Sequence, residues 1–373
     1  MKHLPSVDSS RKWSRRKFLY IGAATTVSVV TYGCLQESEE LLEIYHLPKK
    51  FTRRAGELTA NICGSLSSQT ESARYRLNQS DWQGLPQGEP RVPEPLFTIE
   101  IKASDLLEGE NILEIEVKPK SSDALKTLKF QLAYDPTPIQ LPLKMTWSSS
   151  SDLDVQDGRW ETFEIDGEWR VRPKPGFEEY DRILNVTGAF SGGRRIETDL
   201  VFRDPGWLGW RGKRAYGFGL LTLWGGHLEM TDVRPRRGWL YGLGWFYAPR
   251  RSPEQEHDPG LVLEFSSKVG DEKNEREFEF FPSELKKDVR YSIVTEAVPV
   301  LSKAGKYLYW KQRLKWWDAS TPEPDQWLEA EDNKSSDSLL PNGEYAVSLL
   351  THRTQVEFGS VIVKPLESIV IDS

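Results

Sequence analysis

The sequence predicts an all-β protein of two domains, a small β-sandwich followed by a larger one. Apolar and polar residues alternate with a period of two from about residue 50 onward, which is typical of strands with one buried face. No segment after residue 34 has helical spacing of its apolar residues over three turns. The length of 373 residues leaves room for two domains with hydrophobic cores of their own.

Residues 1–34 are predicted to be an export signal. Basic side chains between residues 11 and 17 precede a short apolar stretch over residues 18–30, an arrangement typical of such signals. The string Ser14-Arg15-Arg16-Lys17-Phe18-Leu19 resembles the twin-arginine signal. The resemblance implies export of an already folded chain, with Arg15 and Arg16 as the signal residues. The alternative is an amphipathic basic helix.

A lipid anchor is expected at the end of this signal. Thr31-Tyr32-Gly33-Cys34 resembles the lipobox of bacterial lipoproteins, although Thr31 and Tyr32 depart from its usual residues. The resemblance implies acylation of Cys34 and contact with the membrane through the N-terminal anchor only. Ordinary cleavage nearby, or an uncleaved anchor, are the alternatives. A periplasmic or cell-surface location follows from either reading of the signal.

The charge and the cysteines exclude several classes of protein. Residues 1–34 carry six basic side chains and one acidic side chain, so their removal changes the net charge from −7 to −12. This acidic balance argues against nucleic acid as a partner. Without Cys34, Cys63 is the sole cysteine, so no disulfide within the chain is expected.

Residues 35–50 are expected to be a polar linker, and residues 51–143 a small antiparallel sandwich. Its predicted strands have alternating patterns, such as Leu113, Ile115 and Val117 with charged residues between them, and Gly109-Glu110-Asn111 predicts a turn. The step Leu107-Glu108-Gly109-Glu110-Asn111, followed by an alternating strand, resembles bacterial immunoglobulin-like domains. Prolines at positions 136, 138 and 142 cannot enter a central strand, so the domain boundary is placed there.

Residues 144–373 are expected to form one large all-β domain. The predicted strands cover residues 196–202, 261–265, 277–281, 291–297, 345–350 and 356–363. Three segments of this domain resemble the concanavalin A-like jelly roll of the lectin and laminin-G type. They are residues 157–170 with Trp160 and Trp169, residues 216–227 with Trp224 and His227, and the closing strand 356–363. Residues 314–317 and 322–327 are also similar to that fold. The resemblance implies a fold that hosts lectins, adhesion modules, glycosidases and lyases.

A cluster of aromatic and basic residues in the larger domain is the candidate ligand-binding site. Indole rings with a polar edge suit the faces of sugars, and arginine forks bind carboxylate and sulfate. The alternatives are that the rings fill the core and that the basic residues pair with acidic ones in this chain. From residue 203 to residue 251 there are nine basic and three acidic residues. The candidate residues are Trp207, Trp210, Trp224, His227, Arg234, Arg236, Arg237, Trp239 and Trp245.

A catalytic alternative rests on Glu164-Ile165-Asp166-Gly167-Glu168. Glycosidases that share the jelly roll carry Glu-x-Asp-x-Glu on one strand, which would place Glu164, Asp166 and Glu168 on one face as acid and nucleophile. Asp166-Gly167 between two alternating runs instead favours a hairpin turn, which would divide the carboxylates between two strands.

No metal site is expected from the spacing of the five histidines. Calcium, which lectin-like sandwiches often use, has Asp152 and Asp154 as candidate ligands, but their spacing is not that of a calcium-binding loop.

Taken together, these patterns favour an exported, envelope-associated protein that binds a polysaccharide or envelope glycan, with an anionic glycan favoured by the arginines. A polysaccharide-cleaving hydrolase or lyase and a protein-binding adhesion or assembly lipoprotein are the alternatives.

Overall fold

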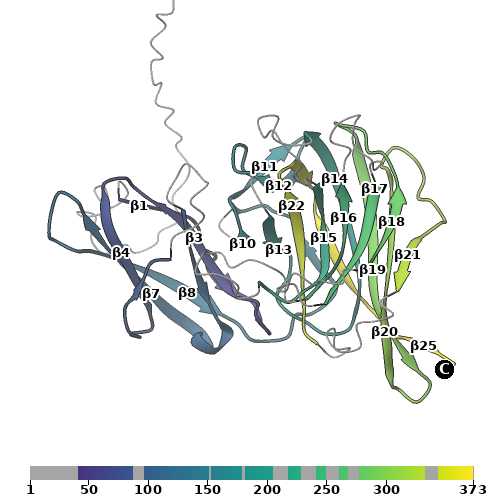
Figure 1. The fold of residues 1–373 in the computed structure, drawn as a ribbon, viewed down its shortest axis with the longest axis horizontal. Coiled ribbons are helices and arrows are strands. Elements are labelled where there is room, and N and C mark those ends of the chain that lie inside the picture. Colours follow the sequence, from purple (N-terminus) through teal and green to yellow (C-terminus); the bar gives the residue numbers. More distant parts are fainter. Residues whose placement is uncertain are drawn as a thin grey trace, which may run out of the picture.

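The computed structural model describes residues 41–86, 96–150, 153–178, 181–204, 217–227, 241–248, 260–267, 277–331 and 343–372 (Figure 1). At positions 204, 241–243, 248, 262, 264–267 and 277–280 only the backbone is described. The described residues form two β-sandwiches that lie side by side. An all-β chain with a smaller sandwich before a larger one is therefore confirmed. Among these residues, no helix is long and apolar enough to cross a bilayer.

The smaller sandwich consists of a three-stranded sheet and a five-stranded sheet with one shared core. The three-stranded sheet has the order β1 (Leu42–His46), β3 (Ala60–Leu66), β6 (Leu96–Ile101). The five-stranded sheet has the order β2 (Lys50–Phe51), β8 (Lys126–Tyr134), β7 (Gly109–Pro119), β4 (Thr70–Leu77), β5 (Gln83–Gly84), and a 3-10 turn, η1 (Ala103–Asp105), precedes β7. The predicted alternation is confirmed in β7, where Leu113, Ile115 and Val117 are buried in this core.

Two local expectations for this part of the chain are wrong. Residues 42–46, expected in a linker, form strand β1, because Leu41 and Leu42 are apolar enough to be buried in the core. Residues 109–111, expected in a turn, begin β7, and the turn precedes them. The buried Asn111 side chain closes that turn, because its amide accepts a hydrogen bond from Leu107 N and donates one to Leu107 O.

The larger sandwich packs a seven-stranded sheet against a ten-stranded sheet. The seven-stranded sheet has the order β10 (Asp154–Asp157), β13 (Arg182–Asn185), β22 (Ala346–His352), β15 (Gly217–Trp224), β16 (Tyr241–Ala248), β17 (Gly260–Ser267), β18 (Glu277–Pro282). The ten-stranded sheet has the order β11 (Trp160–Ile165), β12 (Glu168–Pro173), β23 (Gln355–Phe358), β14 (Gly193–Asp204), β19 (Arg290–Ser302), β20 (Tyr307–Asp318), β21 (Leu328–Glu331). Three further strands pair at its sides, namely β24 (Val361–Leu366) on β14, β9 (Leu143–Met145) on β24 and β25 (Ile369–Ile371) on β19.

The last long strand expected from the sequence is divided in two. Residues 356–363 were expected to form one strand, but β23 ends at Phe358 and β24 begins at Val361, and both pair with β14. The interruption falls at Gly359, whose carbonyl accepts a hydrogen bond from Trp147 Nε1 at 2.6 Å. A Cβ at position 359 would lie 2.1 Å from Asp199 Oδ2, so a larger residue there would displace the Asp199 carboxylate.

The two sandwiches meet along the outer face of the seven-stranded sheet. Leu58 of the smaller sandwich packs against Ile183 of β13, Leu221 and Trp224 of β15 and Leu350 of β22. The backbone of Glu57 bonds to that of Gly225. The smaller sandwich therefore covers this face of the seven-stranded sheet at β13, β22 and β15, whereas the outer face of the ten-stranded sheet lies away from it (Figure 1).

Candidate functional site

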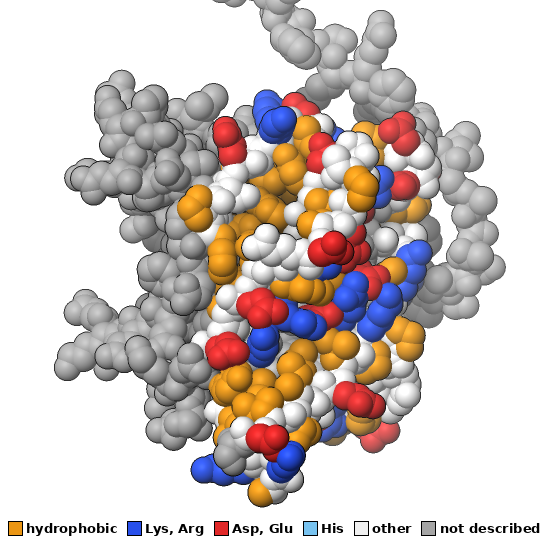
Figure 2. Space-filling model, turned by 90° about the vertical axis from the view of Figure 1, so that its right-hand side faces the viewer, with side chains coloured by type: hydrophobic (Ala, Val, Ile, Leu, Met, Phe, Trp, Pro, Cys, Tyr) orange, Lys and Arg blue, Asp and Glu red, His pale blue; other side chains and the backbone are white. Residues whose placement is uncertain are grey.

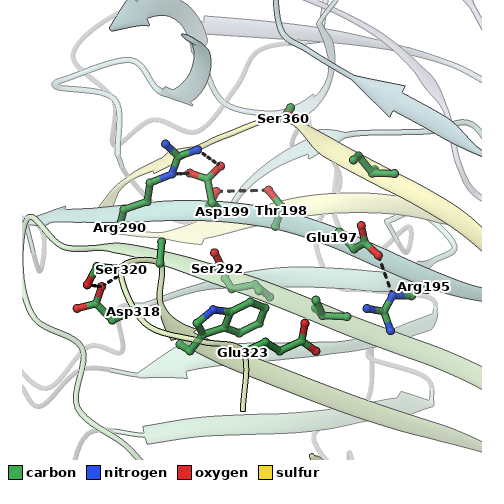
Figure 3. Close-up of a pocket in the computed structure, with 15 residues that line it drawn as sticks. Arg195, Glu197, Thr198, Asp199, Arg290, Ser292, Asp318, Ser320, Glu323 and Ser360 are labelled. Carbon is green, nitrogen blue, oxygen red and sulfur yellow. Dashed lines mark hydrogen bonds and ion pairs between the residues drawn. The ribbon is translucent and has the colours of Figure 1, made fainter. Parts of the chain in front are cut away.

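A shallow groove of about 850 Å³ lies on the outer face of the ten-stranded sheet (Figure 3). Strands β14, β19, β20 and β24, together with the turn after β20, provide its lining. The lining residues are Arg195, Glu197, Thr198, Asp199, Arg290, Ser292, Ile293, Val294, Trp317, Asp318, Ala319, Ser320, Glu323, Ser360 and Ile362.

Strand alternation places the groove's one indole on the outside of the sheet. Leu314 and Trp316 of β20 contact the core, and Trp316 stacks on Tyr291 with ring centroids 5.9 Å apart. Trp317, the next residue, faces the opposite way and lines the groove, where it is partly exposed. Trp317 pairs with Ser292 on β19, and Ser292 pairs with Asp199 on β14. The groove therefore has an indole, a hydroxyl and a carboxylate in one row across three strands.

Two arginines hold the carboxylate of Asp199. Arg170 Nη1 lies 2.6 Å from Asp199 Oδ1, and its side chain is buried. Arg290 Nη2 lies 2.9 Å from Asp199 Oδ2 and Arg290 Nη1 lies 2.9 Å from Glu168 Oε2. The Arg290 side chain is 45 % exposed, so its guanidinium is accessible from solvent while it remains paired. Figure 3 shows this pair at one end of the groove.

A second ion-pair cluster lies at the other end. The Glu197 carboxylate accepts hydrogen bonds from Arg195 Nε at 2.8 Å and from Lys364 Nζ at 2.7 Å. Arg195 also donates to Glu296 at 2.9 Å. Burial acts to raise the pKa of Glu197, but hydrogen bonds from Lys364 and Arg195 outweigh it and hold the pKa below its usual range. Glu197 is therefore ionised at neutral pH.

The third side of the groove is built from the segment after β20. The Glu323 carboxylate accepts a hydrogen bond from Lys315 Nζ at 3.0 Å. Lys315 Nζ also lies 4.7 Å from the centroid of the Trp327 ring. Arg313 lies at the same distance from that ring. Asp318 accepts from the backbone and hydroxyl of Ser320 at 2.9 and 2.7 Å. Figure 2 shows the side of the larger sandwich where β20 and β21 lie, with acidic and basic side chains interspersed among hydrophobic ones.

The two predicted tryptophans that the structure describes, Trp224 and Trp245, do not line this groove. Trp224 and Trp245 are both fully buried: Trp224 lies under the smaller sandwich, and Trp245 lies in the core between the sheets. The expectation that these two rings are exposed is therefore wrong. His227 is also buried, against the edge of Trp224 with ring centroids 5.1 Å apart.

Ten further predicted residues lie outside the described part of the chain. They are Trp207, Trp210, Arg234, Arg236, Arg237 and Trp239 of the ligand-binding cluster, Arg15, Arg16 and Cys34 of the export signal and anchor, and the candidate calcium ligand Asp152. Their roles stay predictions.

The three candidate catalytic carboxylates are divided by a hairpin turn. Asp166 and Gly167, with φ angles of 54° and 80°, join β11 to β12 as the sequence favoured. Glu164 pairs with Trp169, whereas Glu168 pairs with Ile165, so the two glutamates face opposite sides of the hairpin. They cannot act together on one glycosidic bond, and the hydrolase hypothesis loses its acid and nucleophile at this site.

The described residues hold no group of three or more potential metal-ligating side chains. Asp154, named as a candidate calcium ligand, instead accepts a hydrogen bond from Arg54 Nη2 at 2.6 Å and one from Asn185 Nδ2 at 3.1 Å. Its carboxylate therefore joins the two sandwiches.

The site residues predicted from the sequence do not include Trp317, Arg290, Asp199 or Arg195. The segment 314–317 was used only for its resemblance to a fold. The alternation of Leu314 and Trp316 with Lys315 and Trp317 is a signal that would have placed Trp317 on the outer face.

Comparison with known proteins gives distant structural similarity only. No protein-family model matches the chain, and no curated protein matches it. Among solved structures, the potassium-bound carbohydrate recognition domain of Emp46p aligns with a TM-score of 0.33 and 12% sequence identity, over 55% of this chain and 88% of that one. Its metal-free form aligns with a TM-score of 0.31 and 13% identity over the same shares.

Proposed function

We propose that this protein binds carbohydrate in the groove on the outer face of the ten-stranded sheet. The observation that supports this most is the partly exposed Trp317 ring beside Ser292, Asp199 and Arg290. The apolar face of a sugar ring stacks on an indole, while its hydroxyls bond to polar groups around it. An open groove across several strands suits an extended chain of sugar units.

Binding without cleavage fits the carboxylates of the groove better than hydrolysis does. A glycosidase needs one carboxyl with a raised pKa as general acid and a second carboxylate nearby. Glu197 has a lowered pKa, and Asp199 and Glu323 are ion-paired with Arg170, Arg290 and Lys315. None of these carboxylates is in a setting that favours a general acid.

The cellular setting that we propose rests on the sequence of residues 1–34. The twin-arginine string at residues 14–19 supports export of the folded protein, and Gly33-Cys34 supports a lipid anchor. A periplasmic or cell-surface protein tethered in this way meets envelope glycans and extracellular polysaccharides, so the setting agrees with a carbohydrate ligand.

A protein-binding adhesion or assembly role is the second candidate. The burial of Trp224 and Trp245 favours it, because it removes two of the rings that were expected to contact sugar. Carbohydrate binding in the groove requires the Trp317 ring, whereas the protein-binding role does not. Substitution of Trp317 therefore distinguishes the two candidates.

Affinity gel electrophoresis of the full chain tests the proposal. The gels contain dextran, hydroxyethyl cellulose, galactomannan or xyloglucan, or the charged polymers dextran sulfate and carboxymethyl cellulose. Retardation by at least one polymer that is lost in Trp317→Ala is expected. Trp169→Ala is the matched control, because Trp169 is 38 % exposed but lies on the opposite face of β12 from Glu168 and Arg170. Migration unaffected by every polymer would refute carbohydrate binding and favour the protein-binding role.

A further inference from the structure

The charges in the groove are arranged in a way that selects among carbohydrates. The lining contains two cations, Arg195 and Arg290, and four carboxylates, Glu197, Asp199, Asp318 and Glu323. Resting on the proposed function, we infer that the groove binds a neutral glycan and discriminates against sulfated or uronate-containing ones.

Both lining arginines are already engaged by carboxylates of the protein. Arg290 contacts Asp199 and Glu168, and Arg195 contacts Glu197 and Glu296. Glu296 is buried and also accepts from Arg313 Nε at 2.9 Å. A sulfate or carboxylate that took the guanidinium fork of Arg290 or Arg195 would leave Asp199, Glu197 or Glu296 with one cation in place of two, held by Arg170, Lys364 or Arg313 alone. Weakening an ion pair of a partly buried carboxylate in this way is costly.

The carboxylates of the groove add direct repulsion. Asp318 has hydrogen bonds from Ser320, which lower its pKa, so it keeps its negative charge at neutral pH. An anionic ligand would therefore meet more negative than positive groups along the lining.

The same groups are well suited to hydroxyls. An arginine in an ion pair keeps N–H donors that point elsewhere, and a paired carboxylate keeps free lone pairs. The hydroxyls of Ser292 and Ser360 line the groove between the two clusters, and Val294 and Ile362 give its floor apolar patches. A sugar hydroxyl donates and accepts at once, so it can bond to both members of an ion pair without separating them.

This inference reverses the sequence-based preference for an anionic glycan. That preference counted the basic residues between positions 203 and 251, of which the structure describes the side chain of Arg203 alone. Arg203 lies 2.7 Å from Glu357 and 3.2 Å from Asp288, so it too is paired.

Pairs of polymers that share a backbone but carry neutral or anionic groups test the inference. Retention of the full chain is measured on dextran against dextran sulfate and on hydroxyethyl cellulose against carboxymethyl cellulose, in low salt and in about 0.5 M NaCl. We expect a neutral polymer to retain the wild type and Trp169→Ala but not Trp317→Ala. The affinity of the wild type for this polymer should change less than about twofold between the two salt concentrations.

The possible results separate the inference from the proposed function. Retention only by charged polymers, abolished by Trp317→Ala and weakened at least about tenfold by salt, would overturn the neutral ligand but keep the groove as the site. Retention that survives Trp317→Ala would place the ligand on another surface and overturn both. Absence of retention on any polymer would likewise overturn both.

Discussion

Arg54 of the smaller sandwich and Asp154 of the larger one form an ion pair across the junction, with Arg54 Nη2 2.6 Å from Asp154 Oδ2. The Arg54 side chain is completely buried, and its guanidinium also lies 5.3 Å from the ring of Phe51. Asn61 and Gln156 add hydrogen bonds between the sandwiches, to Gln156 O at 2.8 Å and Thr59 O at 3.0 Å. The junction is therefore a packed polar interface in addition to an apolar one.

Breaking this pair is expected to destabilise the whole chain. Arg54→Met leaves the Asp154 carboxylate without its cation, which costs about 3–5 kcal/mol for a buried pair. Urea unfolding followed by circular dichroism measures the loss. Lys50→Met is the matched control, because the Lys50–Asp135 pair is 57% and 37% exposed and contributes at most about 1 kcal/mol. Equal effects of the two substitutions would contradict the role of Arg54.

Asp157 is expected to weaken the fold as the pH rises. Burial raises the pKa of Asp157 to about 7 against the opposing effect of Arg182, which donates to it at 2.9 Å, and Asp181 and Glu100 add to the rise. The folded state thus binds this proton more tightly than the unfolded chain, so the stabilisation exists at low pH and is lost as the pH rises from about 4 to about 7.

Asp157→Asn removes this titration. The free energy of unfolding of the wild type relative to the variant should fall with rising pH in that interval, by at most about 1.4 kcal/mol per pH unit. Urea unfolding of both proteins at a series of pH values measures the difference. If the free energies of unfolding of the two proteins changed with pH in parallel, Asp157 would not titrate between about pH 4 and 7.

His46 is expected to act in the opposite direction. Burial, assisted by Arg159, lowers the pKa of His46 to about 3, and its Nε2 accepts a hydrogen bond from Trp160 N at 2.9 Å. The neutral ring stabilises the fold above about pH 6.5, and this contribution is lost as the pH falls toward 3. His46→Gln keeps an acceptor but cannot titrate, so its stability should fall less steeply with acid than that of the wild type. Thermal melts of both proteins across this pH range measure how the melting temperature depends on pH. An equal dependence in the two proteins would contradict a role for His46 in acid destabilisation.

The Asp166-Gly167 turn gives a prediction for the hairpin that divides the candidate catalytic residues. Gly167 has φ of +80°, which costs a residue with a side chain about 1–2 kcal/mol. No atom lies within 4 Å of a Cβ placed there, so Gly167→Ala should lose about this much stability from the backbone alone. Gly84→Ala is the control, because position 84 is equally open and has no positive φ. A neutral Gly167→Ala would argue against the turn.

The strands of this protein could be predicted from its sequence because their pattern is local. Alternation identified β7, β14, β17 and β19, and the Asp-Gly pair identified the hairpin, since each depends on neighbouring residues.

The burial of Trp224 could not be predicted in the same way. Strand β15 is buried on both faces because Leu58, 166 positions away in the chain, covers its outer side. Alternation describes one strand and says nothing about what covers it. The groove was missed for the same reason, because its ion pairs join residues of separate strands, such as Arg170 and Asp199.

The central claim is that a carbohydrate occupies the groove at Trp317, and oxidative footprinting tests it most directly. The full chain is exposed to hydroxyl radicals with and without the polysaccharide that retards it, and oxidation of each tryptophan is measured by mass spectrometry. The account predicts protection of Trp317, with Trp169 oxidised equally in both samples. Protection elsewhere, with Trp317 oxidised as before, would contradict it.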